Sequence, residues 1–248
     1  MPDDGLRSEV VIDPAIEAVE IKVTARVSQE DEALELLKST GEEPETRTIY
    51  FFDTPELDLF DKGLVLRARK VRGDEDDSTV KLRPIDPATI PIDWSRTDGF
   101  EIEMDRVGDR EVISAKLSAA QAPGEIDAAV SGERPLRKLF SKDQERLIEE
   151  FGPADVGWDT LTVMGPIDVQ KWKVDFPGFP HDVVAERWIL PDGSDLVELS
   201  ITVRPGEAAD TTTDFSEFLA KHGLDVDGDQ QTKTKGALAF FTAGKSFD

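Results

Sequence analysis

Residues 48–70, TIYFFDTPELDLFDKGLVLRARK, contain the two strands on which the fold prediction depends. An aromatic and β-branched run ends at Pro55, because proline cannot continue a β-ladder, and Gly63 then leads into a second run that carries Arg67 and Arg69. Side chains alternate between the two faces of a strand, so the two arginines share one face. Two adjacent guanidinium groups repel each other unless an anion lies between them. The stretch therefore predicts two β-strands, the second of which needs an anionic partner.

Composition limits the classes of partner that this chain can have. Its 38% hydrophobic content over 248 residues is enough for a core. The 53 acidic residues exceed the 29 basic ones and give a net charge of -24, so the whole molecule repels nucleic acid and anionic membranes. Without cysteine there is no disulfide, thiolate nucleophile or zinc ribbon. We expect a cytoplasmic protein with no nucleic-acid or membrane partner, in which any polyanion binds at a locally basic site.

Further strands repeat the alternation of charged and apolar residues. For a single strand this pattern usually means a solvated outer face, but such a face mixes charges of both signs. Here most of the strands carry charges of one sign on this face. This sorting counts against the alternative that the protein is a purely structural barrel whose acidic surface serves only solubility. The pairs on one face of a strand are basic at Arg67/Arg69, Lys81/Arg83 and Lys171/Lys173, acidic at Glu101/Glu103, and mixed at Glu20/Lys22.

Strands of this kind can close into a barrel. We predict an α+β fold in which the apolar faces point outward under helices and the charged faces line the bore. Because burying unpaired charges costs several kcal/mol each, such a bore has to be wet and to hold counter-charges. The simplest content is a polyphosphate on the basic pairs, with hard divalent cations between its oxygens and the carboxylates.

The chain reads as a single domain over residues 1–248, interrupted by a helical insertion. Residues 114–121 have few β-branched side chains and are interpreted as helical, and Ser141 with Gln144 forms a capping box for a later helix. We therefore assign residues 111–157 to a helical insertion within the domain.

Taken together and in this order, the motifs resemble those of the CYTH family, the triphosphate tunnel metalloenzymes. The resemblance rests on Tyr50-Phe-x-Asp-Thr-Pro55, on Leu64-x-Leu-Arg-x-Arg69, and on the Lys-x-Arg, Glu-x-Glu and N-terminal Glu-x-Lys strands, and it runs from about residue 19 to residue 235. It implies a closed antiparallel barrel of eight strands around a hydrophilic tunnel.

The resemblance also implies roles for individual residues. It assigns triphosphate binding to Lys22, Arg67, Arg69, Lys81, Arg83, Lys171, Lys173 and Lys233. It assigns Mg²⁺ or Mn²⁺ binding to Glu20, Glu101, Glu103, Glu186 and Glu198, and direct roles in catalysis to Glu101, Glu103 and Lys22.

Two positions depart from the family pattern, and both are on the acidic side. Ala18 and Ser200 stand where the family has carboxylates. Either one strongly bound metal suffices, or another carboxylate such as Glu17 or Asp105 substitutes, or activity is reduced.

The function implied is a metal-dependent phosphohydrolase acting on an inorganic or organic triphosphate, such as tripolyphosphate, thiamine triphosphate or ATP. Two alternatives stay open: a class IV-type adenylate cyclase that makes cyclic AMP and pyrophosphate from ATP, and a non-catalytic module that binds polyphosphate or nucleotide. The sequence also leaves a homodimer open.

Overall fold

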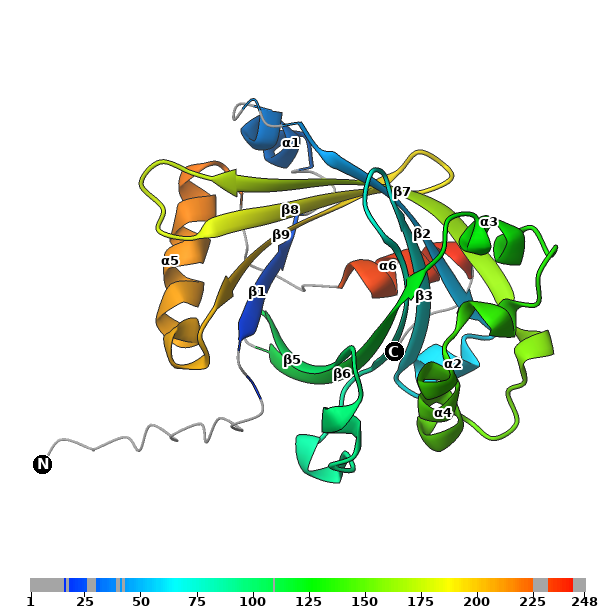
Figure 1. The fold of residues 1–248 in the computed structure, drawn as a ribbon. Helices are drawn as coiled ribbons and strands as arrows, with labels where there is room; N and C mark the ends of the chain where they lie inside the picture. Colours follow the sequence, from blue (N-terminus) through cyan, green and yellow to red (C-terminus); the bar gives the residue numbers. More distant parts are fainter. Residues whose placement is uncertain are drawn as a thin grey trace, which may run out of the picture.

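A computed structural model describes residues 16, 18–25, 30–38, 41, 43–108, 110–224 and 232–242 of the chain. Nine strands form a barrel, with helices around it and one helix inside its outline (Figure 1). The strands are β1 Val19–Thr24, β2 Glu45–Asp53, β3 Leu64–Val71, β4 Asp76–Leu82, β5 Phe100–Val107, β6 Arg110–Gln121, β7 Thr162–Asp175, β8 Asp182–Ile189 and β9 Asp195–Val203.

The helices occupy the connections and the C-terminal part of the described chain. They are α1 Glu30–Lys38, α2 Asp58–Asp61, α3 Glu125–Val130, α4 Lys142–Phe151, α5 Ala208–Lys221 and α6 Lys233–Phe241, with short 3₁₀ turns at Pro87–Thr89, Trp94–Arg96, Leu136–Leu139, Trp158–Thr160 and Pro205–Glu207. Among the helices described, none combines the length and the apolar character needed to cross a membrane.

The predicted closed barrel with flanking helices is confirmed, with two differences in detail. The strand order is β1-β5-β6-β4-β3-β2-β7-β8-β9, and β9 pairs with β1 to close the ring. The barrel has nine strands in the described residues instead of eight, and β1 pairs with β5 in parallel, whereas the other pairings are antiparallel. Alternation along a strand specifies its faces but not the direction of its neighbour, so the parallel pair could not be predicted.

The prediction of a helix for residues 114–121 is wrong, because these residues belong to β6. This strand is the one that was not predicted. Its alanines and serines lack the β-branched residues typical of strands, but β6 pairs with β5 on one side and β4 on the other. Ala115 and Leu117 are buried against the surrounding helices. Pairing on both edges together with this burial outweighs intrinsic propensity. The helical part of the insertion therefore begins at Glu125.

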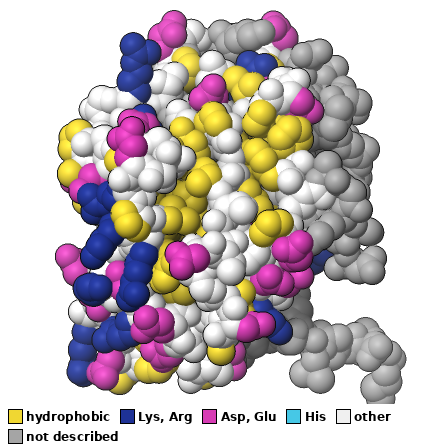
Figure 2. All heavy atoms as spheres, turned by 90° about the vertical axis from the view of Figure 1, so that its right-hand side faces the viewer, with side chains coloured by type: hydrophobic (Ala, Val, Ile, Leu, Met, Phe, Trp, Pro, Cys, Tyr) yellow, Lys and Arg dark blue, Asp and Glu magenta, His cyan; other side chains and the backbone are white. Residues whose placement is uncertain are grey.

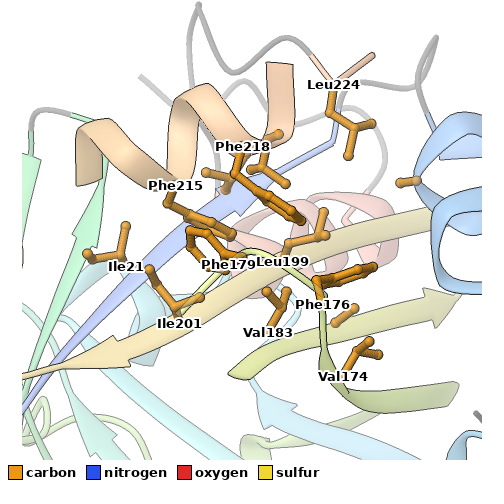
Figure 3. Packing of buried hydrophobic residues seen from close by; sticks show 14 of the residues in the cluster. Ile21, Val174, Phe176, Phe179, Val183, Leu199, Ile201, Phe215, Phe218 and Leu224 are labelled. Carbon is orange, nitrogen blue, oxygen red and sulfur yellow. The ribbon is translucent and has the colours of Figure 1, made fainter. Parts of the chain in front are cut away.

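Helix α5 covers the barrel where β1, β8 and β9 meet. Phe215 and Phe218 point from α5 toward Leu199 and Ile201 of β9 and toward Phe179, which follows β7 (Figure 3). The Phe179 and Phe218 rings stack with their centroids 4.5 Å apart. This apolar contact fixes the helix over the outward face of strands whose other face is charged.

Helices α2, α3 and α4 cover β3, β4 and β6 on another side of the barrel. The predicted capping box of α4 is present, with Ser141 and Gln144 bonded reciprocally. Hydrophobic side chains run down the middle of the face that these helices form, and Lys and Arg side chains gather along one of its edges (Figure 2). The covered outward residues include Leu64, Leu66 and Val80, which alternate with the inward-facing charges.

One part of the barrel interior is apolar, which differs from the predicted wholly charged bore. Phe51 lies opposite Arg67 in the β2–β3 register, so both side chains are on the inward face. Phe51 packs with Trp188 of β8 and with Ala237 and Leu238 of α6. We call this region, centred on α6, the apolar part of the interior; the charged residues described below form the polar part.

Candidate functional site

A cavity of about 510 Å³ lies inside the barrel, next to the N-terminal end of α6. Eight of the nine strands, all except β7, line it, and most of the predicted site residues meet there. The charged residues on its wall are Glu20, Lys22, Arg67, Lys81, Arg83, Glu103, Lys116, Glu186, Glu198, Lys233 and Lys235. The cavity therefore has the sorted mixture of cations and carboxylates that the sequence predicted for the bore.

Arg67 is the most unusual cation of this wall. Its Nε has no hydrogen-bond partner among the described residues, and its Nη2 lies 3.4 Å from the Thr79 hydroxyl. Within the same part of the chain, no carboxylate forms an ion pair with it. Burial, and then the neighbouring Arg69 guanidinium, hold the pKa of Arg67 below its ordinary value. A buried donor group without a partner marks the place where an anion would be bound most favourably.

Asp105 gathers three of the predicted cations. Its carboxylate is 2.9 Å from Lys22 Nζ, 3.1 Å from Arg83 Nη1 and 3.6 Å from Lys81 Nζ, with a side chain only 1% exposed. Burial raises the pKa of Asp105, but the three cations outweigh burial, and the net pKa is lowered. Asp105 opposes Glu20 in the parallel β1–β5 register. It is thus positioned to substitute for a missing carboxylate; Glu17, the other candidate, lies outside the described residues.

Gly63 fixes the position of Arg83. The Arg83 amide donates to the Gly63 carbonyl at 2.7 Å, and a Cβ at residue 63 would lie 2.5 Å from the Arg83 carbonyl oxygen. Gly63 also has φ +76°, which favours glycine. The glycine that leads into β3 therefore also sets the position of Arg83, which directly follows β4.

Lys233 enters the polar part from the first turn of α6. Its Nζ contacts Glu186 and lies 2.9 Å from Glu198, two carboxylates that face each other across the β8–β9 pair. Burial raises the pKa of Glu186, but Lys233, Trp188 and Arg47 lower it well below its ordinary value. Lys233, which the resemblance assigned to triphosphate binding, thus lies on the cavity wall.

Lys116 is a cavity residue that sequence reasoning missed. It lies beside Lys81 across the β4–β6 pair, and its Nζ is 3.1 Å from Glu101 and 2.5 Å from Glu103. Interpreting β6 as a helix hid its alternation, and with it the inward direction of this lysine. The neighbouring β-branched pair Val112–Ile113 was the signal that could have identified the strand.

Other predicted residues lie away from the cavity wall. Arg69 pairs with Asp77 at 2.6 Å, and Lys171 faces Glu45 and Glu186 across the sheet. Lys173 is 68% exposed and pairs with Asp182 at 2.7 Å, so its predicted role in triphosphate binding has no support in the geometry. The remaining predicted residue is Glu101, whose side chain is 60% exposed. Arg47, a cation that was not predicted, contacts Glu45 and Glu186.

Carboxylates in the polar part occur in pairs. Among the residues described, no group of three or more carboxylate or histidine side chains is arranged to hold a metal ion. Mg²⁺, however, is typically bound by one or two carboxylates completed by substrate phosphates and waters. Oxygen donors in pairs such as Glu186/Glu198 and Glu20/Asp105 therefore fit a divalent cation that binds together with a phosphate chain.

No family profile and no curated protein matches this sequence. Solved structures with the same fold include a "putative adenylate cyclase" from Bacillus halodurans. It is 12% identical to this chain, the match covers 89% of this chain and 96% of that one, and the TM-score is 0.59. They also include a "putative adenylyl cyclase" from Hippeastrum that is described as having a dominant triphosphatase activity; it is 16% identical, the match covers 93% of this chain and 97% of that one, and the TM-score is 0.58. The likeness covers about nine tenths of this chain and agrees with the expected resemblance at the level of the fold. This chain therefore shares the fold of these two proteins.

Proposed function

We propose that this protein binds a linear triphosphate in the polar part of its barrel and hydrolyses it. The observation that carries the proposal is Arg67, a buried guanidinium with no acidic partner among the described residues, on the wall of a 510 Å³ cavity. A phosphate oxygen would supply the missing partner. Charge-assisted bonds from arginine to phosphate are among the strongest that proteins form.

The other cations extend this site along the phosphate chain. Lys81 and Arg83 follow Arg67 on the neighbouring strand, and Lys22 and Lys233 approach from the opposite wall. Each of these four has a carboxylate partner in the free protein. A triphosphate would compete with those carboxylates, so binding is favourable only where several cations act together.

Phosphoryl transfer depends mainly on positioning and on stabilising charge in the transition state. Burial lowers the pKa of Lys22, but Glu20, Glu198 and Asp105 outweigh burial and raise it, so Lys22 stays protonated and contributes charge instead of accepting a proton. Glu103 has a lowered pKa and is ionised at neutral pH, so its carboxylate can orient an attacking water molecule.

Mg²⁺ or Mn²⁺ would be held by Glu20 with Asp105 or by Glu186 with Glu198. When bound, it would supply positive charge for the phosphate oxygens. Glu101 and Glu103 both contact Lys116. In this proposal Glu101 keeps its predicted role in catalysis by positioning that lysine.

Hydrolysis is favoured over cyclisation by the comparison with solved structures. Of the two proteins compared above, one is described by its dominant triphosphatase activity, although both carry a cyclase name. In hydrolysis water attacks the phosphorus, whereas in cyclisation a ribose hydroxyl attacks it and pyrophosphate leaves. The same cations serve both reactions.

Phosphorus NMR of the products tests the proposal. Purified protein would be incubated with Mg²⁺ or Mn²⁺ and, separately, with tripolyphosphate, thiamine triphosphate and ATP. We expect orthophosphate from at least one substrate, and loss of this product in Arg67→Met. Arg187→Met is the matched control, because Arg187 lies on the outer face of β8 and pairs with Asp195.

Two outcomes would decide against hydrolysis, and a third would decide against the role of Arg67. Pyrophosphate with a cyclic nucleotide from ATP would establish a cyclase. Triphosphate binding without any product would establish a binding module. Equal activity in Arg67→Met and wild type would remove Arg67 from the site altogether.

A further inference from the structure

Four lysines of the polar part each contact two carboxylates, and one of them, Lys81, shares both of its carboxylates, Glu103 and Asp105, with Lys116 and Lys22. The other three each bridge a pair of their own. Lys22 contacts Glu20 and Asp105, Lys116 contacts Glu101 and Glu103, and Lys233 contacts Glu186 and Glu198. Each bridge joins carboxylates that the strand register places side by side or two positions apart on one strand. In every case a single ammonium group stands where two oxygen ligands converge.

The Lys233 bridge is the most buried of the three. The exposed fractions of the Lys233, Glu186 and Glu198 side chains are 12%, 19% and 5%. Two carboxylates this close repel each other, and burial strengthens the repulsion. In the free protein, the ammonium group of Lys233 offsets this repulsion.

The Lys22 bridge differs in degree, because two further cations, Lys81 and Arg83, contact its carboxylate Asp105. Each of the other bridges has one further cation: Lys81 is 3.1 Å from Glu103, and Arg47 is 3.7 Å from Glu186. Removing Lys116 or Lys233 would leave Glu101 or Glu198, respectively, without an ion pair among the described residues. These two lysines are the ones whose position decides whether a carboxylate pair is available to another cation.

We propose that Lys116 and Lys233 are exchangeable counter-ions that keep divalent cations out of the free barrel and release the carboxylate pairs when a triphosphate binds. This inference rests on the proposed function, because the ammonium groups need phosphate oxygens as their alternative partners. Metal and triphosphate then bind with positive coupling, and by linkage each raises the affinity for the other by the same factor.

The first test measures Mn²⁺ binding to the full chain without any phosphate, through the loss of the electron paramagnetic resonance signal of free Mn²⁺. Lys233→Met and Lys116→Met keep the apolar stem of the side chain and remove its charge. We expect both to bind Mn²⁺ about tenfold more tightly than wild type, a factor in the usual range of such couplings. Circular dichroism establishes that each variant is folded.

Lys70→Met is the matched control, because Lys70 pairs with the single carboxylate of Asp127 outside the barrel. Its Mn²⁺ affinity should equal that of wild type. The inference is overturned if folded Lys116→Met and Lys233→Met bind Mn²⁺ no better than wild type and this control. The two variants concern separate carboxylate pairs, so failure of one to fold leaves the other to decide.

The second test titrates tripolyphosphate into wild type by calorimetry in EDTA and again in Mn²⁺. We expect binding in EDTA, weakened in Lys233→Met, because the cations alone receive the phosphate chain, and tighter binding of wild type in Mn²⁺. The same affinity of wild type in EDTA and in Mn²⁺ would overturn the inference and leave the proposed function standing. No binding under either condition would overturn the proposed function itself.

Discussion

Asp105 lies on β5 with its side chain 1% exposed and contacts Lys22, Lys81 and Arg83. Asp105→Asn keeps the shape and removes the charge that all three cations share. Breaking a buried ion pair typically costs about 3–5 kcal/mol, since the remaining charges lose their partner. We expect the free energy of unfolding to fall by about that amount, measured by urea denaturation.

A matched substitution outside the barrel separates this effect from a general loss of charge. Asp127 is 56% exposed and pairs with Lys70 on the surface. Asp127→Asn should change the free energy of unfolding by less than about 1 kcal/mol, as is typical of exposed pairs. Equal effects of the two substitutions would show that Asp105 does not hold the polar part together.

Stability should depend on pH through the same groups. The cations lower the pKa of Asp105 below its unfolded value, so its contribution is present above about pH 4 and is lost as pH falls through the folded pKa. The carboxylates raise the pKa of Lys22, so its contribution is present below about pH 10 and is lost as pH rises through the folded pKa.

We therefore expect a plateau of stability between about pH 5 and pH 10, with declines on both sides. Thermal unfolding across this range measures it. In Asp105→Asn the acid decline should become shallower, because one of the groups that take up a proton on acid unfolding is gone. An acid decline of unchanged slope would assign it to other carboxylates.

At the scale of elements, Gln144 connects α4 to the barrel. It is fully buried, its amide donates to the carbonyls of Ser78 and Leu117 at 2.9 Å each, and its oxygen accepts from the Ser78 hydroxyl at 2.9 Å. Gln144→Ala leaves several buried polar groups without this partner, each of which costs about 1–3 kcal/mol. We expect a lower melting temperature and, because α4 lies outside the barrel, an unchanged affinity for tripolyphosphate.

Glu149→Ala on the same helix is the control for this prediction. Glu149 is 69% exposed and its nearest cation, Arg137, is 3.8 Å away. Its melting temperature should be close to that of wild type. A large change in tripolyphosphate affinity in Gln144→Ala would mean that α4 supports the polar part of the interior more directly than its position indicates.

Elements with clear alternation could be predicted from the sequence, and elements held by pairing alone could not. The strand that carries Arg67 was found because charged and apolar residues alternate along it. Strand β6 was missed because its small residues resemble those of a helix, and Lys116 was missed with it. The apolar part was missed because Phe51 and Trp188 read as ordinary core residues until α6 places a hydrophobic partner inside the barrel.

The same limit applies to the ion pairs of the site. Alternation indicates that a side chain points into the barrel, but which carboxylate it meets depends on strand order and register. The parallel β1–β5 pair brings Asp105 beside Glu20, and no local pattern indicates that neighbour. For this reason alternation identified cations that line the cavity, such as Arg67 and Lys81. Lys173 has the same alternation but lies at an exposed end of its strand.

For the molecule as a whole, a net charge of -24 opposes the approach of any polyanion. Binding of a triphosphate therefore depends on the few cations of the polar part, and among them on Arg67, which has no ion-pair partner in the described residues to give up. The wall around it is assembled from eight strands and the start of α6. Closing the barrel is what brings these cations together.

Calorimetric titration of tripolyphosphate into wild type, Arg67→Met and Arg187→Met tests this claim most directly. We expect wild type and Arg187→Met to bind alike and Arg67→Met to lose at least about tenfold in affinity, the equivalent of one charge-assisted hydrogen bond. Its melting temperature should not fall, because the change removes a buried charge without leaving a carboxylate unpaired. Equal affinities of all three proteins would contradict the assignment of the cavity as a triphosphate site.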